Sequence, residues 1–373
     1  METIAHIHKI AEDLMSVSLK NLGIYDDLYN NPNVTEVMIN TNKKIFTKNL
    51  GVGFIKKDEE SKNDDVENLL KVLSSLDTKE LTKDNPSISA KLILSTGEVV
   101  RVEGVIPPIV ANPSLNLRKQ NLFLKSLESY LKDEFINKDV YDFLKKSVED
   151  HRNIIIIGGT DTGKTTFTNA IIDVMQKQQQ RLIIIEEVPE LKVNSDNVNK
   201  IQIIPKVFSS QEALKYCMRA SPERIIFGEI RDGYSAYEFI NGLNSGHPGG
   251  VSTIHADDGL GGLKKLETYI NSAYGKPMSE EIGMTIDVLV VLKMKNYKRY
   301  LASVDVCEGF NSFESKYILK NIYNGEKSSE KLNKKSEILN YLKKTNKFDD
   351  FQLKLLESKD INYLEEFVLK RWI

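Results

Sequence analysis

Short apolar runs recur along the middle of the chain, and each is followed by a polar loop and then by apolar residues at helical spacing. The runs are Ile154–Ile157, Leu182–Ile185, Ile225–Phe227 and Val251–Ile254, and the helix-capable stretch after the first run extends from Phe167 to Met175. Such runs, rich in β-branched residues, are typical of buried strands. Because strands alternate with helices, we expect a mostly parallel sheet and an α/β domain.

The region before these runs has a different pattern, which predicts an α+β module. Val34–Asn40 and Ile45–Asn49 are expected to form strands joined by a polar hairpin at residues 41–44. Lys56–Asn63 is predicted to be a charged loop, and Val66–Leu76 a helix.

A second hairpin is expected next, because apolar and polar positions alternate strictly from Ile88 to Leu94 and again from Val100 to Gly104. Thr96-Gly97 would form its turn. The sheet is predicted to end at Pro107-Pro108, and the segment up to Gln120 to form a domain boundary.

Both ends of the chain carry helical patterns. The first stretch has apolar residues at helical spacing from Ile4 to Leu14, and it lacks the continuous apolar run of a signal peptide, so we expect the protein to stay in the cytoplasm. Residues 326–373 are proline-free and rich in lysine, with apolar residues such as Ile338, Leu342, Leu364 and Phe367 at helical spacing. They predict a helical tail, which either docks on other proteins or packs on the preceding domain.

The most informative motif follows the first apolar run. Gly158, four further residues and then Gly163-Lys164-Thr165 satisfy the phosphate-binding pattern G-x-x-x-x-G-K-[ST]. Backbone N–H groups in such a loop bind phosphate at the N-terminus of the next helix. Lys164 would neutralise the β- and γ-phosphates of ATP, and the Thr165 hydroxyl would bind Mg²⁺. The predicted nucleotide-binding residues are Gly158, Gly159, Thr160, Asp161, Thr162, Gly163, Lys164, Thr165 and Thr166.

Two later strands end in carboxylates, and a third ends in a histidine. Glu186 follows Leu182–Ile185, Glu229 follows Ile225–Phe227 after one glycine, and His255 follows Val251–Ile254. Sites in parallel sheets lie beyond the carboxyl ends of the strands, so these side chains are expected near the bound phosphates. Two carboxylates there predict Mg²⁺ and water chemistry, and His255 would sense the nucleotide through the γ-phosphate or a carboxylate.

Composition sets broad limits on this interpretation. The 373 residues suffice for two or three domains, and a formal net charge of -2 gives no general preference for nucleic acid or anionic membranes. No apolar run is long enough to span a bilayer. Cys217 and Cys307 are far apart in sequence and lack metal-ligand spacing, so both are predicted to be reduced and buried.

Taken together, these motifs resemble the secretion and traffic ATPases of bacterial type II and type IV systems, most closely the conjugative-transfer (TrbB-like) branch. Gly158–Thr166 is similar to the Walker A loop, Ile185–Glu190 to the acidic box, Met218–Asp232 to the Walker B signature and Gly246–His255 to the histidine box. The resemblance extends from about residue 25 to about residue 309, and the upstream module shares it through Val34–Asn40, Arg101–Pro108 and Leu115–Lys119.

The resemblance implies a hexameric ring of two-domain subunits that hydrolyses ATP with Mg²⁺. In fold, it implies a RecA-like P-loop motor with a mostly parallel sheet, preceded by an α+β N-terminal domain and followed by a helical extension. The implied boundaries are 1–118 for the N-terminal domain, 119–130 for a linker, 131–309 for the motor and 310–373 for the extension.

The same resemblance assigns roles to individual residues. Glu186 would activate the attacking water, Glu229 would be the Walker B carboxylate and a Mg²⁺ ligand beside Thr165, and His255 would sense the γ-phosphate. Arg101 and Arg118 match N-domain arginines that close on the γ-phosphate, although both could instead be ordinary exposed arginines. Family loops usually have glycine where Asp161 stands, and a carboxylate there is expected to oppose phosphate binding.

Three functions therefore compete. The leading one is an ATPase motor for substrate transfer or pilus assembly by a type IV secretion or conjugation machine, held at the inner membrane by partner proteins. A weakly hydrolysing nucleotide-binding scaffold is an alternative, with Asp161 as its mark. A nucleic-acid translocase is another, although the chain has no basic aromatic platform to support direct nucleic-acid binding.

Overall fold

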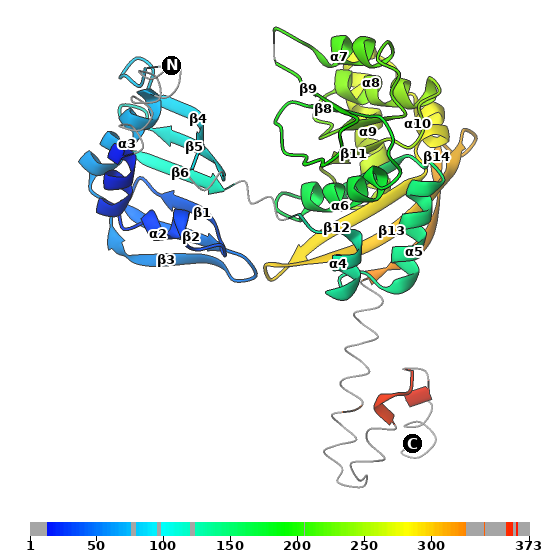
Figure 1. Ribbon diagram of the computed structural model, residues 1–373, viewed down its shortest axis with the longest axis horizontal. Coiled ribbons are helices and arrows are strands. Elements are labelled where there is room, and N and C mark those ends of the chain that lie inside the picture. The colour runs from blue at the N-terminus through cyan, green and yellow to red at the C-terminus, as the bar shows by residue number, and fades with distance from the viewer. Residues whose placement is uncertain are drawn as a thin grey trace. The chain divides into compact units, whose positions relative to one another are not determined.

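A computed structural model describes residues 13–75, 80–94, 98–119, 124–204, 206–325, 339, 356–360 and 363–364. The chain divides into two compact units, whose main parts are coloured blue to cyan and green to orange in Figure 1. The first comprises Met1–Phe123 with Met294–Arg299, and the second comprises Leu124–Lys293 with Tyr300–Ile373. None of the helices in the described ranges has the length and apolar character needed to cross a membrane.

The first unit contains a six-stranded antiparallel sheet in the order β3-β2-β1-β6-β5-β4. Leucines at helical spacing in α3 (Asn63–Ser75) bury one face of that helix in the same core as the inward-facing residues of β5 and β6. The elements are β1 (Val34–Ile39), β2 (Lys44–Asn49), β3 (Gly53–Glu60), β4 (Ser87–Ile93), β5 (Val99–Val105), β6 (Ser114–Lys119) and the short helix α2 (Tyr25–Tyr29).

Two sequence predictions for this unit are wrong. Lys56–Asn63 is not a loop, because Lys56–Glu60 belongs to β3, an edge strand paired with β2. Most of its side chains are exposed, so it has no apolar periodicity to detect, and charge on an edge strand opposes aggregation. The sheet also does not end at Pro107-Pro108, since β6 lies between β1 and β5 with Leu115 and Leu117 buried.

The second unit contains an eight-stranded sheet in the order β14-β13-β12-β7-β11-β10-β8-β9. The strands from β12 to β9 in this order are paired in parallel. The predicted strands are confirmed as β7 (Ile154–Gly158), β8 (Leu182–Glu186), β10 (Arg224–Phe227) and β11 (Val251–Ile254). The other strands are β9 (Val198–Gln202), β12 (Val288–Lys295), β13 (Lys298–Asn311) and β14 (Lys316–Asn324).

Helices cover both faces of this sheet, which explains why its central strands are continuously apolar. In β7, Ile155 and Ile157 pack in one core with α8 and α9, whereas Ile154 and Ile156 pack in another with α5 and α6. The helices are α4 (Leu127–Lys132), α5 (Lys138–Glu149), α6 (Lys164–Gln176), α7 (Ser210–Cys217), α8 (Gly233–Asn244), α9 (Gly259–Tyr274) and α10 (Ser279–Thr285).

The prediction of a helical extension over 310–373 is wrong for its first part. β14 pairs antiparallel with β13 over Ser303–Asn311, and Tyr317 on β14 is buried. Pairing with a strand already placed in the sheet outweighs the weak local pattern of this segment. The predicted helix that starts at Ile4 is described only from residue 13, where the chain is helical to residue 21. The rest of that helix, the turn at Thr96-Gly97 and most of the tail from 326 onward lie outside the described residues.

Cys217 and Cys307 are buried free thiols, as predicted. Burial raises the pKa of the Cys217 thiol to about 12. A thiol with so high a pKa is an unreactive core residue.

Candidate functional site

The loop between β7 and α6 turns through two left-handed residues. Gly163, at the N-cap of α6, has φ 95°, and Asp161 has φ 63°. Gly158 has no room for a side chain, because a Cβ there would meet the Leu292 carbonyl oxygen and the Thr162 hydroxyl. The Thr162 hydroxyl donates to the Gly159 carbonyl at 2.9 Å and closes the loop on itself. This chain therefore uses Asp at a left-handed position that glycine adopts without strain.

Lys164 begins α6 and folds back over the loop. Its Nζ donates to the carbonyl oxygens of Gly158 at 3.0 Å and Gly159 at 2.9 Å, and the side chain is only 8% exposed. Burial lowers the pKa of Lys164 from 10.5 to about 8, and the nearby carboxylates of Glu229 and Asp161 offset only part of that effect. The ammonium is thus held in a poorly solvated position where an anionic ligand would stabilise it.

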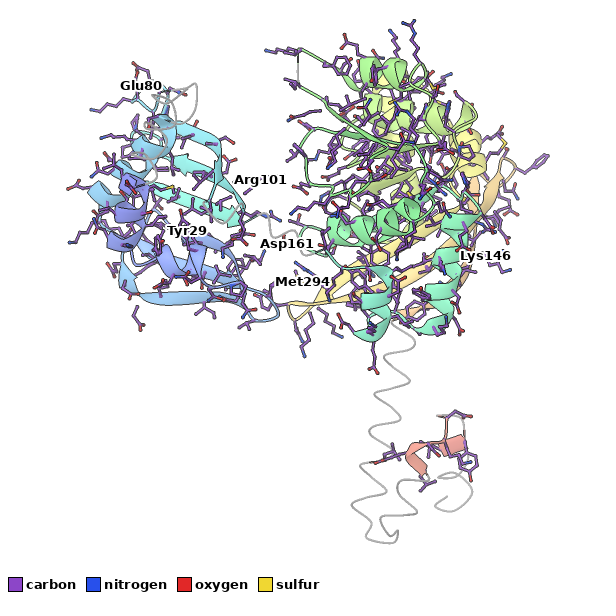
Figure 2. All side chains as sticks on the ribbon, in the orientation of Figure 1. Tyr29, Glu80, Arg101, Lys146, Asp161 and Met294 are labelled. Carbon is purple, nitrogen blue, oxygen red and sulfur yellow. The ribbon has the colours of Figure 1, made fainter. Side chains whose placement is uncertain are left out.

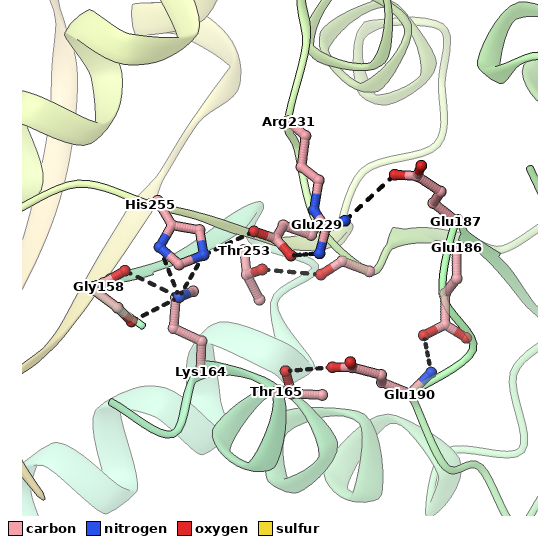
Figure 3. A network of polar contacts seen from close by, with 12 residues as sticks. Gly158, Lys164, Thr165, Glu186, Glu187, Glu190, Glu229, Arg231, Thr253 and His255 are labelled. Atoms are coloured by element: carbon pink, nitrogen blue, oxygen red, sulfur yellow. Dashed lines mark hydrogen bonds and ion pairs between the residues drawn. The ribbon is translucent and has the colours of Figure 1, made fainter. Parts of the chain in front are cut away.

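The acidic box forms a tight turn after β8. Glu186 is 5% exposed, and its Oε1 accepts the backbone N–H groups of Glu190 and Leu191, both at 2.8 Å. Burial raises the pKa of Glu186, although the two N–H donors act to lower it. The Glu190 side chain turns toward α6, where its Oε2 accepts the Thr165 hydroxyl at 3.2 Å (Figure 3).

Glu229 lies just beyond β10 and is held through both carboxylate oxygens. Its Oε1 is 2.9 Å from His255 Nε2, and its Oε2 accepts from the Arg231 guanidinium at 2.8 Å. Arg231 also reaches Glu187 at 3.5 Å. The backbone here stays aligned with the sheet, because Ile230 N–H donates to the Thr253 carbonyl and the Thr253 hydroxyl donates to the Gly228 carbonyl.

His255, at the end of β11, connects Glu229 to Lys164. Its ring nitrogens lie 3.3 and 3.5 Å from Lys164 Nζ. Burial and the positive Lys164 lower the pKa of His255 and outweigh Glu229, so the ring is neutral at pH 7. We assign the proton to Nε2, which donates to Glu229 and leaves Nδ1 as an acceptor facing the ammonium (Figure 3).

Arg101 and Arg118 belong to the first unit. They are directly opposite each other on β5 and β6, and Arg118 is in turn opposite Glu36 on β1. The Glu36 carboxylate lies 3.8 Å from Arg118 Nε and 3.3 Å from Lys48 Nζ. Figure 2 labels Arg101 in the first unit and Asp161 in the second. The sheet register therefore gathers both predicted arginines on one face, with like charges as cross-strand neighbours.

The remaining predicted residues belong to the second unit. A pocket there is lined by Thr165, Glu186, Glu187, Glu190, Glu229 and Arg231. Hydroxyl and carboxylate oxygens are the donors that Mg²⁺ prefers, and in nucleotide sites it takes only one or two protein ligands besides phosphate and water. Thr165 and Glu229 in this pocket carry oxygens of these two kinds.

Comparison with known proteins identifies the family. Residues 53–299 match the family described as "Type II/IV secretion system protein". The chain belongs to this family. A "Probable conjugal transfer protein TrbB" of Sinorhizobium fredii is 32% identical over 280 residues, which cover 74% of this chain and 84% of that protein. A "Type IV secretion system protein VirB11" of Bartonella quintana is 26% identical, over 72% of this chain and 85% of that protein.

Solved structures in this comparison agree with the fold. The Legionella pneumophila ATPase DotB superposes with a TM-score of 0.60 at 16% identity, covering 96% of this chain and 92% of that chain. The pilus retraction motor PilT with bound ADP gives a TM-score of 0.57 at 15% identity, covering 95% and 99%. This member of the type II/IV secretion family thus has an N-terminal unit and a sheet-containing core like theirs.

Sequence reasoning did not assign roles to Glu190 or Arg231, although both stand inside the motifs of this family member. Glu190 is four residues after Glu186 in a loop, and Arg231 is two residues after Glu229. Glu190 enters the site because a turn brings it back to Thr165, and Arg231 enters it through the irregular backbone after β10. The sequence offered one indication that these two residues are functional, namely that each is a charged residue inside a recognised motif.

Proposed function

We propose that this chain is the motor of a type IV secretion or conjugation machine, a RecA-like P-loop ATPase that hydrolyses ATP with Mg²⁺ and works as a hexameric ring. The supporting observation is one set of contacts at the carboxyl edge of the sheet. There, Lys164 Nζ lies 3.5 Å from His255 Nδ1, and His255 Nε2 lies 2.9 Å from Glu229 Oε1.

Different residues would bind the triphosphate and the Mg²⁺ ion. Loop N–H groups at the N-terminus of α6 and the Lys164 ammonium would hold the triphosphate. Thr165 and Glu229 would hold Mg²⁺, whose contribution is to neutralise charge on the phosphates. A phosphate oxygen would give Lys164 an anionic partner in addition to the neutral carbonyls it now contacts, which is favourable for a buried ammonium.

His255 is suited to report the γ-phosphate. It is neutral, it donates to Glu229, and its other nitrogen faces Lys164, the residue that would move toward phosphate. A movement of Lys164 would therefore alter the hydrogen bond that His255 donates to the Glu229 carboxylate. Glu187 and Arg231 extend this network away from the P-loop.

The first unit would contribute Arg101 and Arg118 toward the γ-phosphate. Two guanidinium groups facing each other across strands are stabilised by an anion brought to that face, and closure onto phosphate would couple hydrolysis to domain motion. Glu36 lies on this face and would compete for Arg118.

The relatives supply the biological setting. The matched TrbB is named for conjugal transfer and the matched VirB11 for type IV secretion, and the structural neighbours are titled an ATPase and a retraction motor. By analogy, we place this protein in the cytoplasm at the inner membrane, in contact with secretion-system partners. The tail from residue 326 would either bind those partners or pack on the motor.

Steady-state ATPase assays with Mg²⁺ test the proposal. Wild type should turn over ATP, Lys164→Ala should lose nucleotide binding, and Glu229→Gln should bind nucleotide but hydrolyse it at least about 100-fold more slowly. Particle images with an ATP analogue should show sixfold rings. Absence of both Mg·ATP affinity and turnover in any assembled form would refute the motor, and turnover that requires DNA would favour a translocase.

A further inference from the structure

Three tyrosine rings gather where the start of α8 meets the end of α9. Tyr234 and Tyr237 are three residues apart on α8 and share one side of that helix. The Tyr237 ring stacks on the Tyr274 ring of α9, with centroids 4.1 Å apart and 30° between the ring planes. The Tyr234 ring meets the same Tyr274 ring edge-on, at 5.7 Å and 72°. Gly233 permits this close approach of the two helices, because a Cβ there would lie 2.1 Å from the Tyr269 carbonyl oxygen.

The ring cluster is held in place from one side and open on the other. In the second unit, α8 packs against both α7 and α9 (Figure 1). The Gln211 side chain on α7 donates to the Tyr274 hydroxyl at 3.0 Å, which ties α9 to α7. Tyr237 and Tyr274 are partly buried against the core below, whereas Tyr234 is 52% exposed. The rings are therefore positioned in advance for a ligand that arrives on the Tyr234 side.

Glu238 adds a buried carboxylate to this cluster. It follows Tyr234 by one helical turn and is 9% exposed. Within the described part of the chain, its oxygens accept no hydrogen bond and take part in no ion pair. Burial raises the pKa of Glu238, and Lys215 on α7 offsets only part of that effect. Burial and the negative charge of Glu238 raise the pKa of the Tyr274 hydroxyl, which agrees with a carboxylate close to the rings.

We propose that Tyr234, Tyr237, Tyr274 and Glu238 form a binding site for an arginine side chain of a partner protein. A buried carboxylate is costly unless a cation is paired with it. A cation over an aromatic ring is attracted by the negative face of the ring, and the planar guanidinium also stacks on such rings. Its N–H groups can at the same time donate to Glu238. The inference goes beyond the proposed function, since none of these four residues belongs to the nucleotide site.

Peptide titration followed by fluorine NMR tests the site. The full-length protein is labelled with fluorotyrosine, and the signals of the three rings are assigned with Tyr234→Phe, Tyr237→Phe and Tyr274→Phe. The probe is a short glycine peptide with one central arginine, blocked at both ends. It should shift the three signals saturably at peptide concentrations of about a millimolar. The same peptide with citrulline, which has nearly the shape of arginine without its charge, should leave them unshifted.

Substitutions separate recognition from a structural role. Glu238→Gln keeps the shape of the side chain and removes its charge, so it should weaken binding of the arginine peptide at least about tenfold. Without peptide, the same variant should unfold at or above the wild-type Tm, because the fold no longer buries an unpaired charge. Glu308→Gln, which removes an exposed carboxylate of β13, is the matched control and should bind the peptide as wild type does. Lys215→Gln should tighten binding, since it removes a nearby competing cation.

Three results would overturn the inference. Equal shifts with the arginine and citrulline peptides would show that charge is not recognised, and unchanged binding in Glu238→Gln would show that this carboxylate is not the partner. A Tm of Glu238→Gln clearly below the wild-type value would show that the carboxylate is already paired within the folded chain. A lysine peptide that binds as tightly as the arginine peptide would refute the choice of arginine. These measurements need no ATP turnover, so a failure here is distinct from a failure of the proposed function.

Discussion

Lys164 is predicted to make the stability of the nucleotide-free protein rise with pH. The perturbation is Lys164→Met, which keeps a long side chain and removes the ammonium. In the folded protein the ammonium is 8% exposed and contacts neutral carbonyls, so its pKa is about 8, whereas an unfolded chain gives 10.5. Unfolding therefore takes up a proton between about pH 8 and pH 10.5, and wild type gains stability as pH rises through that window.

The magnitude follows from the two pKa values. A difference between 10.5 and about 8 corresponds to about 3 kcal/mol in full, of which about 2 kcal/mol accrues between pH 7 and pH 9.5. Other titrating groups contribute to both proteins, so the quantity to follow is the stability of wild type minus that of Lys164→Met. For a unit of this size, about 2 kcal/mol corresponds to a relative rise of about 4–8 °C in Tm.

The assay is thermal unfolding of both proteins without nucleotide at pH 7.0, 8.0, 9.0 and 9.5. Lys145→Met, which removes an exposed lysine on α5, is the matched control and should show no growing difference from wild type. A wild-type minus Lys164→Met difference that stays flat across this range would refute the description of Lys164 as a buried ammonium.

Three further predictions concern other groups. Asp161→Gly should tighten Mg·ATP binding about fivefold, because it removes a negative charge whose repulsion of the phosphates is worth about 1 kcal/mol. Glycine also suits the left-handed backbone at this position. An unchanged dissociation constant at fixed salt would contradict this prediction. His255→Ala should lower kcat at least about tenfold with little change in nucleotide affinity, since it removes the donor to Glu229; a change in affinity alone would contradict the sensor role. Arg224→Lys should lower the free energy of unfolding by about 2 kcal/mol in thermal unfolding. The Arg224 guanidinium is fully buried and donates to the carbonyls of Val148 and Gly249 and to two glutamine side chains. A single ammonium cannot replace all of these hydrogen bonds. Wild-type stability of that variant would show that the guanidinium geometry is dispensable.

The central strands and the phosphate-binding loop could be predicted from the sequence because their signals are local. Four apolar isoleucines at 154–157 have to be buried on both faces, and the glycines with Lys164 at fixed spacing specify a turn into a helix. The same logic placed Glu186, Glu229 and His255 at the carboxyl ends of strands or just after them, since a strand determines the position of the residues at its end.

Features that depend on partners distant in sequence could not be predicted in this way. β3 and β14 lie at sheet edges with mostly exposed side chains, so hydrogen bonding to β2 and β13 decides their conformation and no apolar period reveals it. The prolines at 107 and 108 indicate a turn, but only long-range pairing with β1 makes the segment after them a central strand.

The same difference between local and long-range contacts applies to the site. The sequence by itself determined which chemical groups stand at the ends of these strands and in the loop after β7, because strand ends and motif spacing are set by neighbouring residues. Tertiary structure alone decided which group each one contacts: Glu190 meets Thr165 across 25 positions, and His255 meets Lys164 across 91. A hydrogen bond depends on distances of a few tenths of an ångström, and those are set by the packing of several elements at once.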